Sequence, residues 1–178
     1  MSPRAIRPYA FAIAAAALLS ACETPYRLPT EQESRAQVTV ESKDDVVINN
    51  LNAEGCYRGR TELKGAMFIR AGEEALIEYH GRAACRISFS FLPEEGKRYR
   101  IVGQSFRNLR ERFEARREIE SKQGIAYEAC GVNLYREEEN AQLVPMKLQR
   151  RVISALPTCA KFITPEEWQK IRVPPPFK

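Results

Sequence analysis

The sequence has few of the residue patterns that catalysis requires. It contains one histidine, His80, which precedes Gly81 at a predicted turn. Neither a Gly-x-Ser-x-Gly elbow, nor a Walker loop, nor a His-Glu-x-x-His motif occurs in its 178 residues. A hydrolase needs a nucleophile, a base and a group that orients the base, and the sequence identifies no such set. We therefore expect that the protein is not an enzyme.

Carboxylates at turns are the one feature that favours catalysis. Glutamates stand together at three predicted turns, where such side chains are usually just solvated. A fold that gathered them in one cleft would supply a general acid and a general base. A periplasm-facing hydrolase that uses these carboxylates is therefore the alternative function. The residues concerned are Glu73 and Glu74, Glu94 and Glu95, and Glu137 to Glu139.

Closely spaced cysteine pairs are also missing. Structural zinc sites commonly use pairs such as Cys-x₂-Cys, and no two of the five cysteines stand that close together. With a single histidine, the chain has no recognisable set of metal ligands. We expect neither a metal nor another cofactor.

The apolar run near the N-terminus is too short to cross a membrane. Tyr9 to Leu19 is an unbroken run of 11 apolar residues, and a transmembrane helix needs about 20. Arg4 and Arg7 precede this run. A short positive segment followed by a short apolar one is typical of a signal peptide, which we place at residues 1–21.

The segment Leu19-Ser20-Ala21-Cys22 closes that run and resembles the bacterial lipobox. The resemblance implies a diacylglycerol on the Cys22 thiol, cleavage before Cys22 and acylation of the new N-terminus. Several acyl chains on one residue would give a stable membrane anchor. Glu23 stands where aspartate is the familiar inner-membrane retention signal, which implies the outer membrane, facing the periplasm. The alternative is an ordinary secretory signal cut near Ala21, with Cys22 left as a spare thiol.

The mature chain has the size of one domain. Removing residues 1–21 from the 178 leaves 157, enough for a single hydrophobic core. Two of the 28 basic residues go with them, so 26 remain against 23 acidic ones. The resulting charge of about +3 does not indicate a nucleic-acid partner. Residues 22–36 are polar, contain two prolines and predict a flexible tether, and residues 37–178 form the single domain.

Four cysteines remain besides Cys22, and an even number in an exported chain predicts two disulfides. The favoured pairing is sequential, Cys56 with Cys85 and Cys130 with Cys159, because both pairs are 29 residues apart. The alternative joins Cys85 to Cys130, since each opens a strand-like run, and leaves Cys56 for Cys159.

From residue 37 onward, apolar and polar residues alternate as they do in β-strands. Predicted hairpins join residues 66–70 to 75–79, 85–91 to 99–103, and 130–135 to 144–152. Six to eight mainly antiparallel strands are expected to form a β-sandwich. The predicted core consists of Ile87, Phe89, Phe91, Tyr99, Ile101, Val132, Leu134, Met146 and Leu148.

The segment Phe91-x-Pro93-x-x-Gly96-x-x-Tyr99 combines turn residues with two aromatic residues placed to face each other. It resembles the central hairpin of small proteobacterial lipoproteins with an immunoglobulin-like or transthyretin-like β-sandwich. The resemblance extends over about residues 55–150. It implies the sandwich fold and carries no activity.

Residues 107–122 interrupt the β pattern. Ten of these 16 residues are charged, and opposite charges recur four residues apart, as on the surface of a helix. We predict a short exposed helix whose first turns dock through Phe106, Leu109 and Phe113, with a mobile excursion between strands as the alternative. A second short helix is predicted from the capping box at Thr164 to about Ile171.

These features together predict a lipid-anchored envelope protein that acts as a non-catalytic binding, docking or structural accessory module. Its partners would be the membrane, through Cys22, and another envelope protein. Basic residues of the charged helix are the candidate contacts, with a plain solvated surface as the alternative reading. They are Arg110, Arg112, Arg116 and Arg117.

Overall fold

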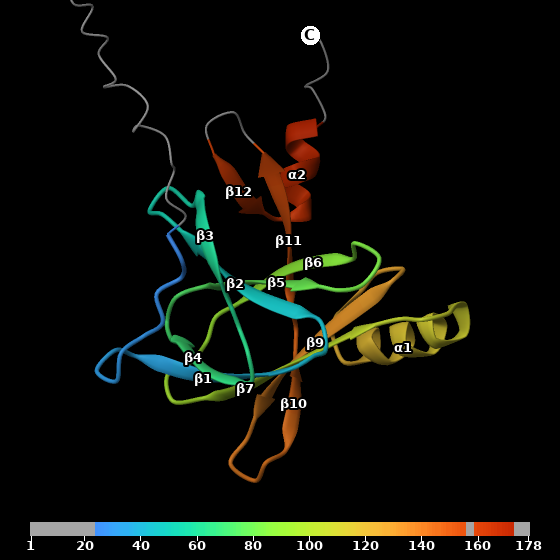
Figure 1. Cartoon of the computed structure of the whole chain (residues 1–178), viewed down its shortest axis with the longest axis horizontal. Helices are drawn as coiled ribbons and strands as arrows, with labels where there is room; N and C mark the ends of the chain where they lie inside the picture. Colours follow the sequence, from blue (N-terminus) through green and yellow to red (C-terminus); the bar gives the residue numbers. More distant parts are fainter. Residues whose placement is uncertain (1–23, 156–158, 173–178) are drawn as a thin grey trace, which may run out of the picture.

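The computed structural model describes residues 24–155 and 159–172, which form twelve strands and two helices. The strands make two six-stranded sheets that pack as a sandwich (Figure 1). The predicted mainly-β sandwich, with one charged helical insertion and a short C-terminal helix, is confirmed. The expected six to eight strands were too few. The predicted signal peptide at residues 1–21 and the predicted lipid attachment at Cys22 lie outside the described residues.

Sheet A has the strand order β10-β9-β7-β1-β4, with β8 pairing to β9. Its pairings are antiparallel except for β1 with β7, which run parallel. Its strands are β1 (Arg35–Glu41), β4 (Ala66–Arg70), β7 (Arg98–Ser105), β8 (Ile125–Ala126), β9 (Cys130–Glu137) and β10 (Leu143–Met146).

Sheet B has the order β12-β11-β6-β5-β2-β3, and all its pairings are antiparallel. A single bridge between Cys56 and Lys161 brings its two edges together. Its strands are β2 (Asp45–Leu51), β3 (Tyr57–Glu62), β5 (Ala75–His80), β6 (Arg86–Phe91), β11 (Gln149–Ala155) and β12 (Ala160–Ile163).

The predicted core is confirmed. Eight of the nine predicted residues are buried, and Met146 is half-buried and packs against them. However, β6 is buried on both faces, because Ser88 and Ser90, on the face opposite Phe89, are 7% and 0% exposed. Their hydroxyls donate to the carboxylates of Glu78 and Glu74, at 2.9 and 2.6 Å. Alternation therefore marked the core face correctly and missed a polar face that is buried through hydrogen bonds.

Two of the three predicted hairpins are wrong, because the chain crosses between the sheets at those turns. β4 lies in sheet A and β5 in sheet B, and in the same way β6 lies in sheet B and β7 in sheet A. Alternation identifies the buried face of a strand but does not identify its hydrogen-bonded neighbour. The acidic turn at residues 137–140 does join an antiparallel pair, β9 and β10. The predicted return strand is divided, however, into β10 in sheet A and β11 in sheet B.

The predicted tether at residues 22–36 is wrong for the described part of that range. The Thr24 amide donates to the Arg58 carbonyl at 2.8 Å, and the Asn50 side-chain amide donates to the Thr24 carbonyl at 3.0 Å. Tyr26 packs against the core, and β1 already begins at Arg35. Gly59 permits this contact, because a Cβ there would lie 2.4 Å from the Thr24 oxygen. The sequence did not reveal this contact, because the segment has no apolar periodicity and docks mainly through its backbone.

The favoured sequential disulfide pairing is also wrong. Cys85 bonds to Cys130 and Cys56 to Cys159, with Cα atoms 6.1 and 5.4 Å apart, as the alternative pairing predicted. The first bond joins the start of β6 in one sheet to the start of β9 in the other. The second joins residues next to the two edges of sheet B. Equal sequence spacing carries no information about such contacts, which depend on the strand order.

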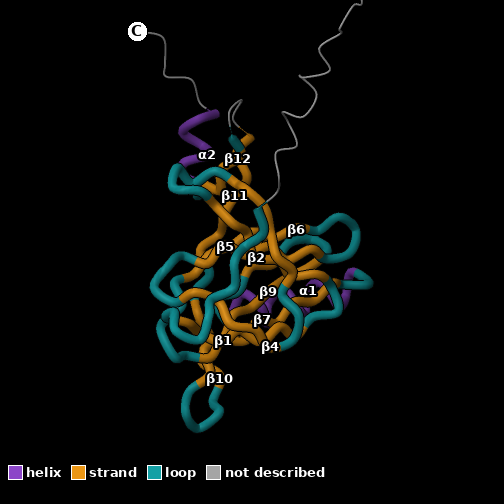
Figure 2. Tube along the Cα trace, turned by 60° about the vertical axis from the view of Figure 1, so that its left-hand side comes forward, coloured by secondary structure: helices purple, strands orange, loops and turns teal. Residues whose placement is uncertain are grey.

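Both predicted helices are present. Helix α1 (Leu109–Ser121) is capped by Asn108, whose side-chain oxygen accepts the Glu111 amide at 2.9 Å. Helix α2 (Pro165–Arg172) has the predicted capping box, in which Thr164 and Glu167 exchange hydrogen bonds of 2.7 and 3.2 Å. α2 and β12 lie at the opposite end of the molecule from the β9–β10 turn, and α1 lies between these ends (Figures 1 and 2).

Candidate functional site

A cavity of about 460 Å³ opens at the place where the two sheets and α1 meet. Three connections line it: the turn between β1 and β2 at residues 41–44, Arg82 after β5, and the stretch from the end of β7 into α1. The last of these contributes residues 103–105, Arg107 and Glu111. No sequence motif marks this site, since its residues come from distant parts of the chain.

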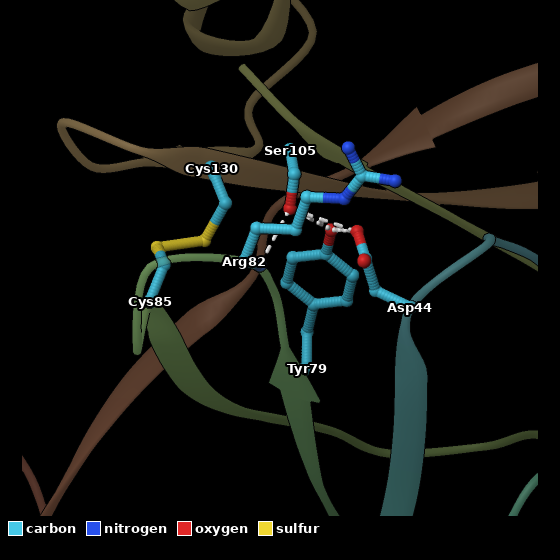
Figure 3. Close-up of a disulfide and its surroundings, with 6 residues drawn as sticks. All are labelled: Asp44, Tyr79, Arg82, Cys85, Ser105 and Cys130. Carbon is cyan, nitrogen blue, oxygen red and sulfur yellow. Dashed lines mark hydrogen bonds between the residues drawn. A yellow bond between two sulfur atoms is a disulfide. The ribbon is translucent and has the colours of Figure 1, made fainter. Parts of the chain in front are cut away.

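A hydrogen-bonded network at the cavity is centred on Asp44 (Figure 3). Its Oδ2 accepts the Tyr79 hydroxyl at 2.5 Å and the Ser105 hydroxyl at 2.8 Å. The Ser105 oxygen also accepts the Arg82 backbone amide at 2.8 Å. Tyr79 is fully buried, and burial, together with the hydrogen bond to Asp44, raises the pKa of its phenol. The network ties the ends of β5 and β7 to the start of β2.

Close packing holds the tyrosine ring in this position. A Cβ at Gly103 would lie 2.4 Å from the Tyr79 ring, and one at Gly81 would lie 2.8 Å from the Ser105 oxygen. Two glycines therefore leave room for the phenol and hydroxyl that reach Asp44. The hydrogen-bonded network therefore depends on close packing at the ends of β5 and β7.

The Cys85–Cys130 disulfide lies beside this network and fixes the loop that carries Arg82 (Figure 3). The Gly81 amide donates to the Cys85 carbonyl at 2.8 Å, and the Cys85 amide donates to the Arg82 carbonyl at 3.0 Å. Cys130 is in register with Ser105 across β9 and β7. The disulfide therefore links the loop that carries Arg82 to β9, and through β9 to the end of β7.

The carboxylates of the three predicted turns are not gathered in one cleft, although Glu137 to Glu139 together line a cavity of about 370 Å³. Glu94 and Glu138 approach each other only through Arg136, which contacts them at 3.2 and 2.8 Å. Glu137 lies 3.4 Å from Arg98, and Glu74 is held by Ser90 and Arg151 at another turn. These contacts are typical of carboxylates that stabilise turns.

Among the residues that the structure describes, the most buried carboxylate is Glu78 in β5, which is 1% exposed and which sequence reasoning missed. Arg86 contacts it at 2.7 Å, Ser88 donates to it at 2.9 Å, and His80 lies 3.6 Å away. Its position among apolar strand residues, opposite serine and arginine, was the available signal. Ser88 donates to Glu78 and not to His80, so the three residues do not form the relay of a serine hydrolase.

The four predicted contact arginines line one exposed helix. Arg110 pairs with Glu114 at 3.2 Å and Arg116 with Glu120 at 2.7 Å, whereas the guanidinium of Arg112 lies 5.5 Å from the ring centre of Phe113. The predicted docking of Phe113 is wrong, because this ring is 60% exposed. The helix docks instead through Ile119, which is 2% exposed and lies over Gly131. Arg112 and Arg117 lack ion pairs within the described chain.

Comparison with family models, with curated proteins and with solved structures finds no match to the chain. Across residues 24–155 and 159–172, no helix has the length and apolar character needed to cross a bilayer. The same residues contain no cluster of three or more histidine, cysteine or acidic side chains suited to a metal ion. The functional argument therefore depends on the geometry of the chain itself.

Proposed function

We propose that the protein is a lipid-anchored, non-catalytic binding module of the outer membrane, and that it faces the periplasm. The lipobox-like Leu19-Ser20-Ala21-Cys22 supports the anchor. Two disulfides between the remaining cysteines support an exported protein, because disulfides persist in oxidising compartments. The cavity beside Asp44 would be the binding site.

One observation supports a binding role over a catalytic one. The polar side chains at the cavity that could act in catalysis already form hydrogen bonds with each other. The Ser105 hydroxyl donates to Asp44 and accepts the Arg82 amide, so its proton is directed to a carboxylate that also holds a tyrosine. Serine nucleophiles are normally activated by an adjacent base such as histidine, and His80 does not line this cavity. The network therefore serves to fix the shape of the site.

The hydrolase alternative has less support. It requires two turn carboxylates that face each other with different protonation states. Glu94 and Glu138 each form an ion pair with Arg136 instead, and this arrangement is typical of carboxylates that stabilise a turn.

The docked N-terminal segment determines how the anchor would hold the domain. Cys22 is two residues before Thr24, and two residues span at most about 7 Å. A lipid on Cys22 would therefore keep β3 close to the membrane. Arg58 and Arg60 on this strand are exposed, and neither forms an ion pair in the described part of the chain. Each would gain about 1 kcal/mol beside anionic headgroups.

Fractionation tests the anchor. The wild-type protein should partition with membranes and show the added mass of acyl chains on Cys22, and Cys22→Ser should remain unprocessed and lack this mass. A mature wild-type chain that is soluble and carries no acyl mass would refute the anchor.

Cross-linking in the native envelope, followed by mass spectrometry, tests the contact role of α1. Changing Arg110, Arg112, Arg116 and Arg117 to Glu should remove reproducible partners if the helix binds them. The matched control changes Glu114 and Glu120 to Gln, which breaks the same helix ion pairs and keeps the arginines. Equal loss in both variants, or no loss in either, would show that α1 is only a solvated surface.

A further inference from the structure

We propose that the cavity beside Asp44 binds a phosphate group, either of a small phosphomonoester or of a phospholipid headgroup. The inference deepens the proposed binding role and rests on it, but it does not depend on the lipid anchor. It is drawn from the charges that line the cavity.

Three basic side chains line the cavity and have no partner of opposite charge. Lys43, Arg82 and Arg107 are all exposed. In the described residues, eleven other lysine and arginine side chains form ion pairs and these three do not. Other arginines of these residues, such as Arg58 and Arg112, also lack an ion pair, but only these three line this cavity. They come from three loops that are far apart in the sequence, and the fold brings them together at one opening.

The acidic side chains of the same cavity are already engaged. Glu41 pairs with Arg100 at 2.6 Å, Asp44 accepts two hydroxyls, and Glu111 accepts the Arg107 backbone amide at 2.9 Å. Because Arg100 balances Glu41, three cations face two anions. A ligand of negative charge would therefore meet unsatisfied donors.

The start of α1 adds to this preference. The positive end of the helix dipole lies at the N-terminus of α1, two residues after Arg107, and Glu111 in the first turn of the helix lines the cavity wall. Helix N-termini carry the equivalent of roughly half a positive charge. The guanidinium groups of Arg82 and Arg107 offer paired N–H donors, which match the oxygens of phosphate.

Rigidity and size favour a small organic phosphate. The volume of about 460 Å³ falls within the roughly 300–1,000 Å³ typical of small-molecule sites. Arg82 is held at its backbone by Ser105 and by the loop closed at Cys85. A preformed site loses less entropy when the ligand binds.

Calorimetric titration of the mature protein in neutral detergent tests the proposal. Glycerol 3-phosphate is the soluble probe, phosphatidic acid in the same micelles is the headgroup probe, and glycerol is the uncharged control. We expect a phosphate probe to bind, with an affinity that falls as salt is added, and glycerol not to bind. Binding of the soluble probe would identify a free phosphomonoester, and binding of phosphatidic acid alone would identify a headgroup.

The variant Arg82→Gln with Arg107→Gln should weaken this binding by about tenfold or more. Its matched control is Arg110→Gln with Arg116→Gln, which removes two exposed arginines of α1 that already have partners. The control should bind like the wild type, and both variants should melt like it. Absence of binding by either phosphate probe up to about 10 mM, or equal weakening in both variants, would overturn the proposal. Neither result would affect the acyl mass on Cys22. A failure of the phosphate proposal can therefore be told apart from a failure of the proposed lipid anchor.

Discussion

The rings of Phe91 and Tyr99 contact each other across the sandwich, with centroids 5.1 Å apart and planes tilted by 55°. Phe91 ends β6 in sheet B and Tyr99 lies in β7 of sheet A. The Tyr99 hydroxyl oxygen also accepts the amide of Glu94, in the connection between these strands, at 2.9 Å. One aromatic pair thus joins the two sheets and supports the chain that crosses between them.

Truncation of a neighbouring core ring should be costly. Phe89 is fully buried on the same strand, and Phe89→Ala should lower the free energy of unfolding by about 3–5 kcal/mol. Phe113→Ala is the matched control, because that ring is 60% exposed and its loss should change stability by less than about 0.5 kcal/mol. Chemical denaturation measures both. A near-silent Phe89→Ala would mean that Phe89 does not pack in the hydrophobic core.

Non-reducing peptide mapping should recover the pairs Cys85–Cys130 and Cys56–Cys159. Their sequence separations are 45 and 103 residues. In the chain-entropy model, removing the first should cost about 4 kcal/mol and removing the second about 4.7 kcal/mol. Double alanine variants of each pair, compared by denaturation, give these values. Recovery of Cys56–Cys85 peptides from the native protein would contradict the assignment.

Gly59→Ala should detach the N-terminal segment, because the new Cβ would lie 2.4 Å from the Thr24 carbonyl oxygen. Loss of the hydrogen bonds that join Thr24 to Arg58 and Asn50 should cost about 1–3 kcal/mol. Hydrogen exchange at residues 24–26 should become faster. Arg58→Ala is the control, since it shortens an exposed side chain of the same strand. If hydrogen exchange at residues 24–26 were unchanged in Gly59→Ala, the contact with Gly59 would not hold this segment, and the prediction of a flexible tether would stand.

In an alkaline titration, at least three tyrosines should ionise at a higher pH than a free tyrosine does. Burial is the main cause that raises the pKa of the Tyr26, Tyr79 and Tyr99 phenols. A folded-state pKa above the unfolded value of about 10 means that the neutral phenol is favoured in the folded chain. This contribution to stability is fully present below about pH 10 and is lost as the pH rises through the folded-state values.

The ultraviolet absorbance of tyrosinate measures this titration, with the chain in denaturant as the reference. Folded protein should keep part of its tyrosine absorbance change until well above pH 10, and its unfolding free energy should fall over the same range. Superimposable titration curves for folded and denatured protein would contradict the burial of these phenols.

Local patterns in the sequence predicted local structure well. The alternation at Phe89 and Ile101 marked buried positions, and the charge spacing around Arg110 predicted α1. The capping box at Thr164 predicted the start of α2. Each of these signals depends on residues within one or two turns of each other, where backbone geometry directly relates sequence to structure.

The candidate site could not be predicted in this way. Asp44, Tyr79 and Ser105 are separated by at least 26 residues, and only the order of strands brings them together. The position of Thr24 on β3 depends on the missing side chain of Gly59, which no periodicity reveals. The wrong disulfide pairing has the same origin, since the crossing of the chain between sheets decides which cysteines meet.

The Cys56–Cys159 bond has a consequence for how the protein is made. In the export that we propose, Cys56 would leave the channel long before its partner, 103 residues later, and Cys85 would be the first thiol that follows it. An oxidant acting in order of emergence would join Cys56 to Cys85, which is not a native pair. Maturation should therefore need thiol exchange to correct this bond. Refolding of the reduced chain should yield more native protein with a disulfide isomerase than with oxidant alone, and equal yields would show that folding precedes oxidation.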